Sequence, residues 1–378
     1  MPNPWHELTA LGQSVWYDNL NRQLIVSGDL RRMVEEDHVS GGTSNPSIFE
    51  KAVGSSDVYD DDVRRLAEQG ADVARIFDEL TVTDVQVSAD VFRPVYDSTR
   101  GADGYASLEV APDLADNTES TISEARRLFQ TLDRPNAMIK IPGTPAGLPA
   151  IEQCLGEGLN INITLLFGVE NYVQVAAAYI SALEKRAAAG QPIDSIASVA
   201  SFFVSRVDTL TDERLEEKMR DAGEGKKLKL RSLLGRAAIA NAKIAYERYK
   251  QIFSGPRWQA LAAKGARTQR CLWASTSTKN PAYRDVMYVE GLIGPQTINT
   301  VPQSTLDAFR EHGEVAPTLE EDVADARLTL KVIEEAGVDF RAVTDDLQEQ
   351  GVKLFCDSYD KARETIRQKR DALVASRA

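Results

Sequence analysis

Short apolar segments alternate with longer amphipathic stretches along most of this 378-residue chain. This alternation constrains the fold more than any other feature, because it is typical of repeated βα units and not of a sandwich or a helical bundle. Eight such units predict a (β/α)8 TIM barrel. The strand candidates lie near Ser14–Asp18, Gly41–Asn45, Tyr105–Val110, Asn136–Pro142, Asn160–Phe167, Ile196–Val204, Cys271–Thr276 and Thr297–Pro302.

The chain is longer than a barrel requires. A bare barrel takes roughly 250 residues, which leaves well over a hundred for additional helices. We expect a helical insertion at about 211–265 and C-terminal helices at about 304–378, on a single barrel domain that spans residues 1–378. Within the insertion, the basic stretch Lys226 to Lys229 is interpreted as a loop, and the simplest reading of such a loop is a solvated linker.

Composition excludes several classes of function. The net charge of -13 argues against broad binding of nucleic acids or anionic membranes, so an anionic ligand would need a local cationic pocket. No stretch of about 18 apolar residues and no basic leader followed by an apolar run is present, which predicts a cytoplasmic protein. The widely spaced cysteines are expected to be buried thiols in a reducing compartment: Cys154, Cys271 and Cys356.

No motif calls for a metal or another cofactor, and we expect none. The three histidines are scattered outside every strand-end motif, so surface or capping roles are expected for His6, His38 and His312. A metal-dependent enzyme would need a cluster of ligands that the sequence does not show.

Lys140 stands in an otherwise apolar strand candidate, Asn136-Ala-Met-Ile-Lys-Ile-Pro142. A lone ammonium in a buried strand is costly unless something uses it. Burial disfavours the charged form of an amine, which makes a lysine nucleophilic towards carbonyl groups at neutral pH. We therefore interpret Lys140 as a Schiff-base lysine, with a structural ion pair to Glu109 as the alternative.

Polar side chains recur at the ends of six consecutive strand candidates. Alternation along a strand places Asn160, Asn162 and Thr164 on one face, and Lys140, Glu109 and Ser201 on the corresponding face of their own strands. Asp18 and Asn45 end the first two strands. Capping or turn roles explain any one of them, but barrel enzymes place their chemistry at strand ends, so the whole set predicts an active site.

Five segments in order resemble the transaldolase family. They are Gly42-Thr-Ser-Asn-Pro-Ser-Ile-Phe49, Ser107-Leu-Glu-Val110, Met138-Ile-Lys-Ile-Pro142 with Gly147-Leu-Pro-Ala-Ile151, Asn160-Ile-Asn-Ile-Thr-Leu-Leu-Phe167 and Ser201-Phe-Phe-Val-Ser-Arg-Val-Asp208. The resemblance covers about Ser14 to Pro302 and is closest to the longer bacterial form of this class I aldolase superfamily. It implies a pentose phosphate pathway enzyme that moves a dihydroxyacetone unit between sugar phosphates. The implied donors are sedoheptulose 7-phosphate and fructose 6-phosphate, and the acceptors are glyceraldehyde 3-phosphate and erythrose 4-phosphate.

On this resemblance Lys140 forms the Schiff base, whose protonated nitrogen acts as an electron sink while the bond between C3 and C4 breaks. Asp18 matches the aspartate that takes the proton of the C4 hydroxyl during cleavage and returns it to the acceptor. Glu109 and Thr164 match a pair that moves protons through a water while the carbinolamine forms and dehydrates. Two carboxylates would thus have two different tasks.

The resemblance also implies substrate-binding residues. Asn45 and Asn162 match side chains that hold the hydroxyls of the three-carbon intermediate, and Ser201 matches a serine near the same carbons. Packing or turn roles stay open for these three.

Arg206 fits the family's phosphate arginine, whose planar fork suits a phosphate. In the loop after the seventh strand, Ser277 and Lys279 keep the spacing of a serine and an arginine in compact members, although lysine lacks the fork. Ser275 is a second choice for the serine, and Lys279 could instead be a solvated loop residue.

Two rival interpretations remain. One is a simple aldolase of the same superfamily that cleaves or makes fructose 6-phosphate, or acts like a deoxyribose-phosphate aldolase. The other is a non-catalytic barrel that binds sugar phosphates, alone or as a subunit of a complex. The expected partners are sugar phosphates, without nucleic acid or membrane, and assembly into a homo-oligomer is left open.

Overall fold

The computed structural model describes residues 3–375, and its eight strands form one closed parallel barrel in the order β1-β2-β3-β4-β5-β6-β7-β8. This confirms the predicted (β/α)8 barrel. Each strand lies within two residues of its predicted bounds at either end. The strands are β1 (Gln13–Tyr17), β2 (Val39–Thr43), β3 (Ala106–Glu109), β4 (Ala137–Pro142), β5 (Ile161–Leu166), β6 (Ser198–Phe203), β7 (Arg270–Ala274) and β8 (Thr297–Val301).

The chain divides into two compact units, which we describe separately. The lysine unit comprises Trp16–Asn162 with Val352–Ala378, and the arginine unit comprises Met1–Val15 with Ile163–Gly351. The division passes through β1, β5 and the last helix, α17 (Phe340–Ala375). The prediction of one domain over the whole chain stays a prediction.

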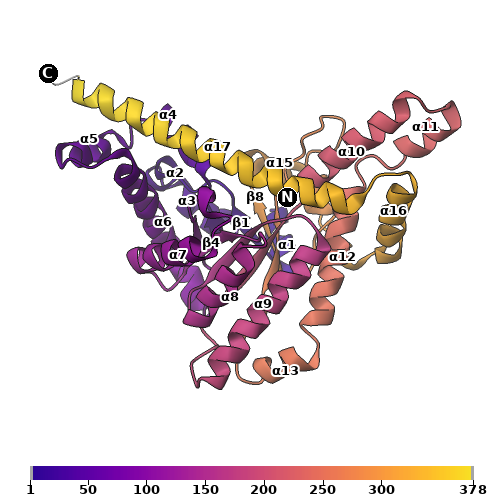
Figure 1. The fold of residues 1–378 in the computed structure, drawn as a ribbon, viewed down its shortest axis with the longest axis horizontal. Coiled ribbons are helices and arrows are strands. Elements are labelled where there is room, and N and C mark those ends of the chain that lie inside the picture. Colours follow the sequence, from indigo (N-terminus) through magenta and orange to yellow (C-terminus); the bar gives the residue numbers. More distant parts are fainter. Residues whose placement is uncertain (1–2, 376–378) are drawn as a thin grey trace. The chain divides into compact units, whose positions relative to one another are not determined.

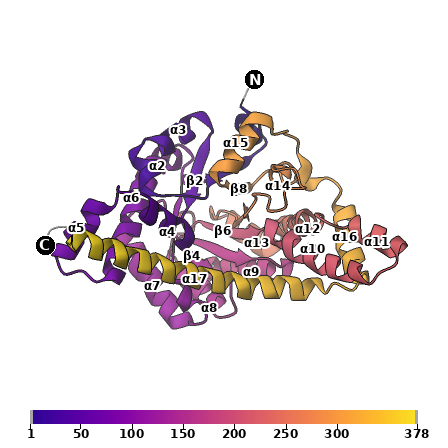
Figure 2. The ribbon, with the colours of Figure 1, turned by 90° about the horizontal axis from the view of Figure 1, so that it is seen from above.

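The lysine unit contains β2, β3, β4 and most of the helices drawn in indigo and magenta (Figure 1). One apolar cluster joins α4, α5 and α6, and the second part of α17 contributes Ala362 and Ile366 to it. Figure 2 shows this part of α17 running past α4 towards α5. The helices are α2 (Arg22–Val26), α3 (Asp29–Glu36), α4 (Pro46–Ser55), α5 (Asp60–Glu68), α6 (Val73–Ser98), η1 (Pro112–Leu114), α7 (Thr118–Leu132) and α8 (Gly147–Glu157).

The register of the strands in the lysine unit sets which side chains share a face. Thr43 on β2 pairs with Ser107 on β3, and Glu109 on β3 pairs with Lys140 on β4. Paired residues of neighbouring parallel strands point to the same side of the sheet, so Glu109 and Lys140 lie side by side. Every residue of β4 is buried, as predicted.

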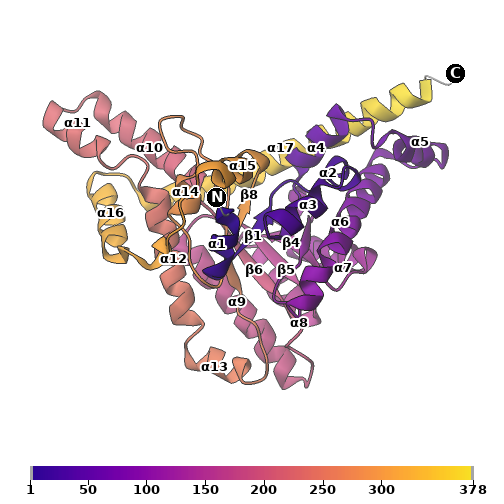
Figure 3. The same cartoon turned by 180° about the vertical axis from the view of Figure 1, so that it is seen from behind.

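The arginine unit contains β6, β7 and β8, paired in parallel with Ser201 opposite Leu272 and Phe202 opposite Trp273. Figure 3 shows α12 next to α16 in this unit, and α13 at the far end of α12. Its helices are α1 (Pro4–Ala10), α9 (Val169–Ala188), α10 (Ser205–Arg220), α11 (Glu224–Arg231), α12 (Ala237–Ile252), α13 (Pro256–Ala262), α14 (Met287–Glu290), α15 (Gln303–His312), η2 (Thr318–Glu320) and α16 (Val323–Glu335).

The basic stretch Lys226 to Lys229 is helical, so the prediction of a loop there is wrong. It forms the middle of α11, which begins at Glu224 after Gly223. Leu230 is buried and therefore sets which face of α11 packs on the protein, while Lys227 forms an ion pair with Glu224 one turn earlier. Lysine and leucine are also good helix formers, a preference that the clustering of charge conceals in the sequence.

The cysteines, the apolar character of the helices and the grouping of possible metal ligands can be described for residues 3–375. Cys154 and Cys271 are buried thiols and Cys356 is partly buried, and none of the three forms a disulfide. Between residues 3 and 375, no helix combines the length and the apolar character that crossing a membrane requires. Among these residues, no three or more His, Cys, Asp or Glu side chains group in a way that could hold a metal ion.

Candidate active site

Lys140 and Glu109 form a buried pair in the lysine unit. Lys140 Nζ lies 3.2 Å from Glu109 Oε2, and the side chains are 6% and 3% exposed. Neither Glu109 oxygen has a hydrogen-bond partner of good geometry among the described residues. A carboxylate that is buried without hydrogen bonds is costly, so this pair is poor as a purely structural device.

The surroundings of Glu109 favour its protonated form. Burial raises the pKa of Glu109, the charge of Lys140 opposes this rise, and the nearby Asp18 adds to it. A carboxyl group with a raised pKa holds its proton to a higher pH than an ordinary glutamate does. The proton-carrying role that the family resemblance implies for Glu109 stays a prediction.

Asp18 follows β1 directly, and its Oδ1 accepts a 2.7 Å hydrogen bond from the hydroxyl of Thr43 on β2. The next residues are anchored by Arg22, which pairs with Asp84 at 2.5 Å and with Asp62 at 2.7 Å. A segment fixed by a partly buried, ion-paired arginine at one end and a strand at the other holds its carboxylate in one place.

The two predicted asparagines have different surroundings. Asn45 caps α4, because its Oδ1 accepts a hydrogen bond from the Ile48 amide at 3.0 Å. Among the described residues, no hydrogen bond uses its Nδ2 donor, so capping and ligand binding are compatible. Asn162 is fully buried on β5 and donates to the Ser107 hydroxyl at 3.1 Å, which turns its carboxamide towards the same face as Glu109.

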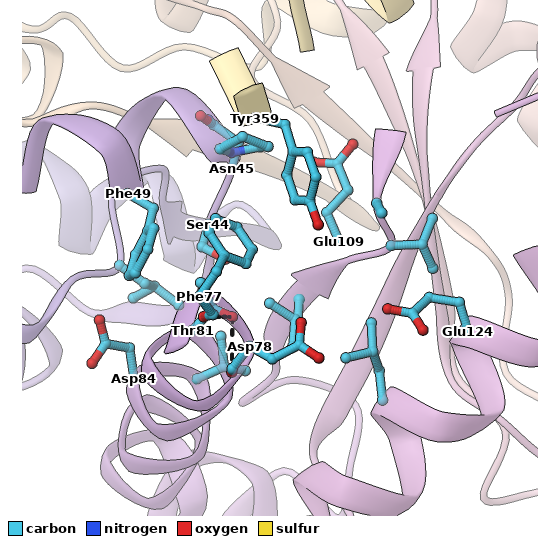
Figure 4. Close-up of a pocket in the computed structure, with 17 residues that line it drawn as sticks. Ser44, Asn45, Phe49, Phe77, Asp78, Thr81, Asp84, Glu109, Glu124 and Tyr359 are labelled. Carbon is cyan, nitrogen blue, oxygen red and sulfur yellow. Dashed lines mark hydrogen bonds between the residues drawn. The ribbon is translucent and has the colours of Figure 1, made fainter. Parts of the chain in front are cut away.

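A cavity of about 30 Å³ extends from Glu109 to the helices outside β3 (Figure 4). Asn45 and Tyr359 of α17 line it together with Glu109. Two further acids, Asp78 and Glu124, lie at its helical side. The cavity therefore connects the face of β3 that carries Leu108 and Val110 with one side of the candidate site.

Thr164 belongs to the arginine unit, where its buried hydroxyl makes no hydrogen bond to a described residue. The next residue, Leu165, has a φ of 59°, which is unusual for a side chain of this size inside a strand. Backbone strain of this kind concentrates at functional sites. Gln348 at the start of α17 supports the strained backbone by donating to the Leu165 carbonyl at 3.1 Å.

Ser201 and Arg206 lie at the junction of β6 and α10. Ser201 is buried on β6, and α10 begins two residues after that strand, with Arg206 in its first turn. The guanidinium of Arg206 lies over the Phe203 ring, 5.7 Å from its centroid. The amino terminus of a helix attracts anions, so this junction is suited to a phosphate.

The loop after β7 separates the two candidate serines. Lys279 Nζ donates to the Ser277 hydroxyl at 2.6 Å, whereas the Ser275 hydroxyl lies 3.0 Å from that of Ser205 at the start of α10. Ser275 has a φ of 56° and thus bends the chain directly after the strand. These contacts favour Ser277 as the companion of Lys279 and give Ser275 the role of joining the loop to α10.

Two buried acids of α10 bind the same loop and the helices next to it. Asp208 accepts hydrogen bonds from the Ala238 amide at 2.8 Å and the Tyr288 hydroxyl at 2.9 Å. Asp212 accepts from the Tyr283 hydroxyl at 2.6 Å and from the Gly235 amide at 3.0 Å. The helix that carries Arg206 is thereby tied to the loop that carries Ser277 and Lys279.

Asp208 should make stability depend on pH. Burial raises its pKa to about 7, while the hydrogen bond from Ala238 opposes the rise. The folded protein then holds a proton that the unfolded chain has lost, so this contribution is present below about pH 4 and disappears as the pH rises towards 7. In the wild-type protein, Asp208 should make the free energy of unfolding fall by about 1.4 kcal/mol per pH unit between pH 5 and 7. We expect Asp208→Asn to lose this fall, as measured by urea unfolding.

The matched control is Asp61→Asn, because the Asp61 side chain is fully exposed. This variant should keep the slope of the wild-type protein. An Asp208→Asn protein whose unfolding free energy follows the wild-type pH curve would contradict the prediction.

The ten predicted site residues fall into two sets. The lysine unit brings together Asp18, Asn45, Glu109, Lys140 and Asn162, and the arginine unit holds Thr164, Ser201, Arg206, Ser277 and Lys279. Thr43 and Ser107 support Asp18 and Asn162; they were not predicted as site residues, although strand alternation indicates them. Phe355, whose ring faces Lys140 from α17, was not predicted either, because its local sequence carries no signal.

A closed parallel barrel with a buried lysine beside a carboxylate is the arrangement expected of an enzyme that acts on carbonyl compounds through an imine. The sequence profile of the transaldolase/fructose-6-phosphate aldolase family matches residues 15–366. The chain therefore belongs to this family.

Similar proteins extend over nearly the whole chain. A transaldolase of Trichodesmium erythraeum (strain IMS101) is 46% identical over 366 residues, which cover 96% of both chains. A transaldolase of Acidothermus cellulolyticus is 48% identical over 356 residues, or 94% of both chains. One of Thiobacillus denitrificans is 48% identical over 353 residues, which are 93% of this chain and 96% of the relative.

Proposed function

We propose that this protein is a transaldolase of the pentose phosphate pathway. It transfers a dihydroxyacetone unit from sedoheptulose 7-phosphate or fructose 6-phosphate to glyceraldehyde 3-phosphate or erythrose 4-phosphate. The observation that carries this proposal is the buried pair of Lys140 and Glu109, whose carboxylate has no hydrogen bond to a described residue. Family membership and relatives that bear the name transaldolase support it.

In this proposal Lys140 attacks the ketone carbon of the donor, and Glu109 with Thr164 moves the protons that turn the carbinolamine into an iminium ion. Asp18 takes the proton of the C4 hydroxyl while the bond between C3 and C4 breaks, and it returns a proton to the acceptor. Asn45 and Asn162 hold the hydroxyls of the three-carbon unit, and Ser201 contacts it near the same carbons.

Arg206, Ser277 and Lys279 bind the phosphate. We expect Arg206→Lys to lower kcat/KM for fructose 6-phosphate about 10- to 100-fold, because a lysine cannot replace two charge-assisted hydrogen bonds of a guanidinium. With fructose, which has no phosphate, the variant and the wild-type protein should react equally slowly. Arg231→Lys on the exposed face of α11 is the control, and an equal loss with both sugars would refute the assignment.

The decisive experiment is mass spectrometry after incubation with fructose 6-phosphate and sodium borohydride, without an acceptor. A transaldolase gives an adduct of dihydroxyacetone mass on the peptide that contains Lys140, and in a parallel sample without borohydride it transfers this unit to erythrose 4-phosphate. A simple aldolase releases dihydroxyacetone and does not transfer it. A folded protein without an adduct would be a binding protein for sugar phosphates.

Sugar phosphates are thus the proposed ligands, and nucleic acids and membranes are not. The cytoplasm is the proposed location, which the three free cysteines support because unpaired thiols are typical of reducing compartments. Self-association into a homo-oligomer belongs to the proposal as well, and light scattering of the purified protein tests it.

A further inference from the structure

An aromatic ring of the last helix covers the nitrogen of Lys140. Phe355 belongs to the part of α17 in the lysine unit, and its ring centroid lies 5.6 Å from Lys140 Nζ. At this distance the face of the ring attracts a positive charge. The ring is itself buried, with 8% of its surface exposed.

The helix holds this ring firmly. One turn after Phe355, Tyr359 packs edge to face on Phe77 of α6, with ring centroids 4.9 Å apart. Further along, Ala362 and Ile366 enter the core of the lysine unit, and Lys369 donates to the Ser56 carbonyl at 2.7 Å. Phe355 is therefore part of a packed element and not of a mobile loop.

In the proposed reaction, cleavage of the donor leaves the three-carbon unit on Lys140 as an enamine. This unit is lost when a proton adds to its C3 carbon and gives an iminium ion, to which water then adds. The resulting carbinolamine breaks its C–N bond and yields dihydroxyacetone and the free amine, without any oxidant or other reactant. Transfer to an aldehyde succeeds only if the three-carbon unit meets the aldehyde before it takes up a proton and water.

The neighbourhood of Lys140 would otherwise favour water. Both Glu109 oxygens are buried and accept no hydrogen bond from a described residue, and burial raises the pKa of this carboxyl group. A water with space beside the nitrogen would find a base in Glu109 and polar partners to hold it. The ring of Phe355 fills one side of this space with carbon.

We propose that Phe355 sets the ratio of transfer to hydrolysis by keeping water away from the nitrogen of Lys140. This role deepens the proposed function and rests on it. It gives the last helix a direct part in deciding which reaction the imine undergoes. The residue acts through the surroundings of the lysine and takes no proton itself.

The test compares two rates in the same preparation of full-length protein. One is the release of dihydroxyacetone from fructose 6-phosphate alone, and the other is the transfer to erythrose 4-phosphate. Their ratio is independent of the fraction of protein that is folded, because both rates fall equally when folded protein is lost. The variants are Phe355→Ala, which opens space for water, Phe355→Leu, which refills most of it, and Leu354→Ala, which truncates an exposed neighbour on the same helix.

We expect the ratio of release to transfer to rise about tenfold or more in Phe355→Ala and about threefold or less in Phe355→Leu. Leu354→Ala should keep the wild-type ratio. An unchanged ratio in Phe355→Ala overturns the inference. A Phe355→Leu protein with a ratio of release to transfer as high as that of Phe355→Ala also overturns it. A wild-type protein that neither forms the borohydride adduct nor releases dihydroxyacetone would instead refute the proposed function itself.

Discussion

Lys140→Met should abolish transfer of the dihydroxyacetone unit, with a loss of about 10⁴-fold or more, and should leave no borohydride adduct. Methionine fills the volume of the lysine stem but has no amine to attack the ketone. The variant should still fold, because the Glu109 carboxyl group, whose pKa burial already raises, becomes protonated when its cation is removed. Single-turnover assays and mass spectrometry measure the two effects.

Two controls separate nucleophilicity from charge and from general damage. Lys140→Arg keeps a cation beside Glu109 but cannot form the imine, so it should be as inactive as Lys140→Met. Lys51→Met, on the exposed side of α4, should have wild-type activity. If Lys140→Met kept a tenth of the activity, the imine would have to form elsewhere.

Glu109→Gln should slow the formation of the imine about 10²- to 10⁴-fold, because the amide has nearly the same shape but cannot carry a proton. The adduct that finally accumulates with borohydride should have an unchanged mass on the same peptide. Its rate of appearance, followed by quenching at successive times, is the measurement. This outcome would assign to Glu109 a role in proton transfer and not in positioning.

Glu119→Gln is the control for the loss of one carboxylate from the lysine unit, since Glu119 lies exposed in the first turn of α7. Its borohydride adduct should appear at the wild-type rate. Equal rates of labelling in Glu109→Gln and the wild-type protein would leave the pair with Lys140 as a structural ion pair, which is the alternative that the sequence left open.

The strands could be predicted from the sequence because their pattern is local. Each strand candidate is short and apolar and is bounded by polar or turn-forming residues, so the bounds agree closely with the structure. Alternation along these strands also placed Glu109 and Lys140 on matching faces, and the register of β3 and β4 confirms this placement. These features depend on neighbours within a few residues.

The other features depend on contacts between distant segments. Asn45 combines a helix cap with an available donor, and the two serines differ in their distant contacts, Ser275 with Ser205 and Ser277 with Lys279. The strained φ of Leu165 beside Thr164 follows from packing and not from residue type. The helix α11 was missed because its run of lysines is typical of a solvated segment, whereas one buried leucine at position 230 decides its structure.

The cover that α17 places on Lys140 also has a consequence for the order in which the molecule is completed. Phe355 and Lys140 lie about 200 residues apart in the sequence, so their contact is strongly non-local and closes late. At about 5–20 residues per second of synthesis, the helix leaves the ribosome about ten seconds or more after the lysine. During that interval the nitrogen lacks its aromatic cover, so docking of the last helix completes the surroundings of Lys140.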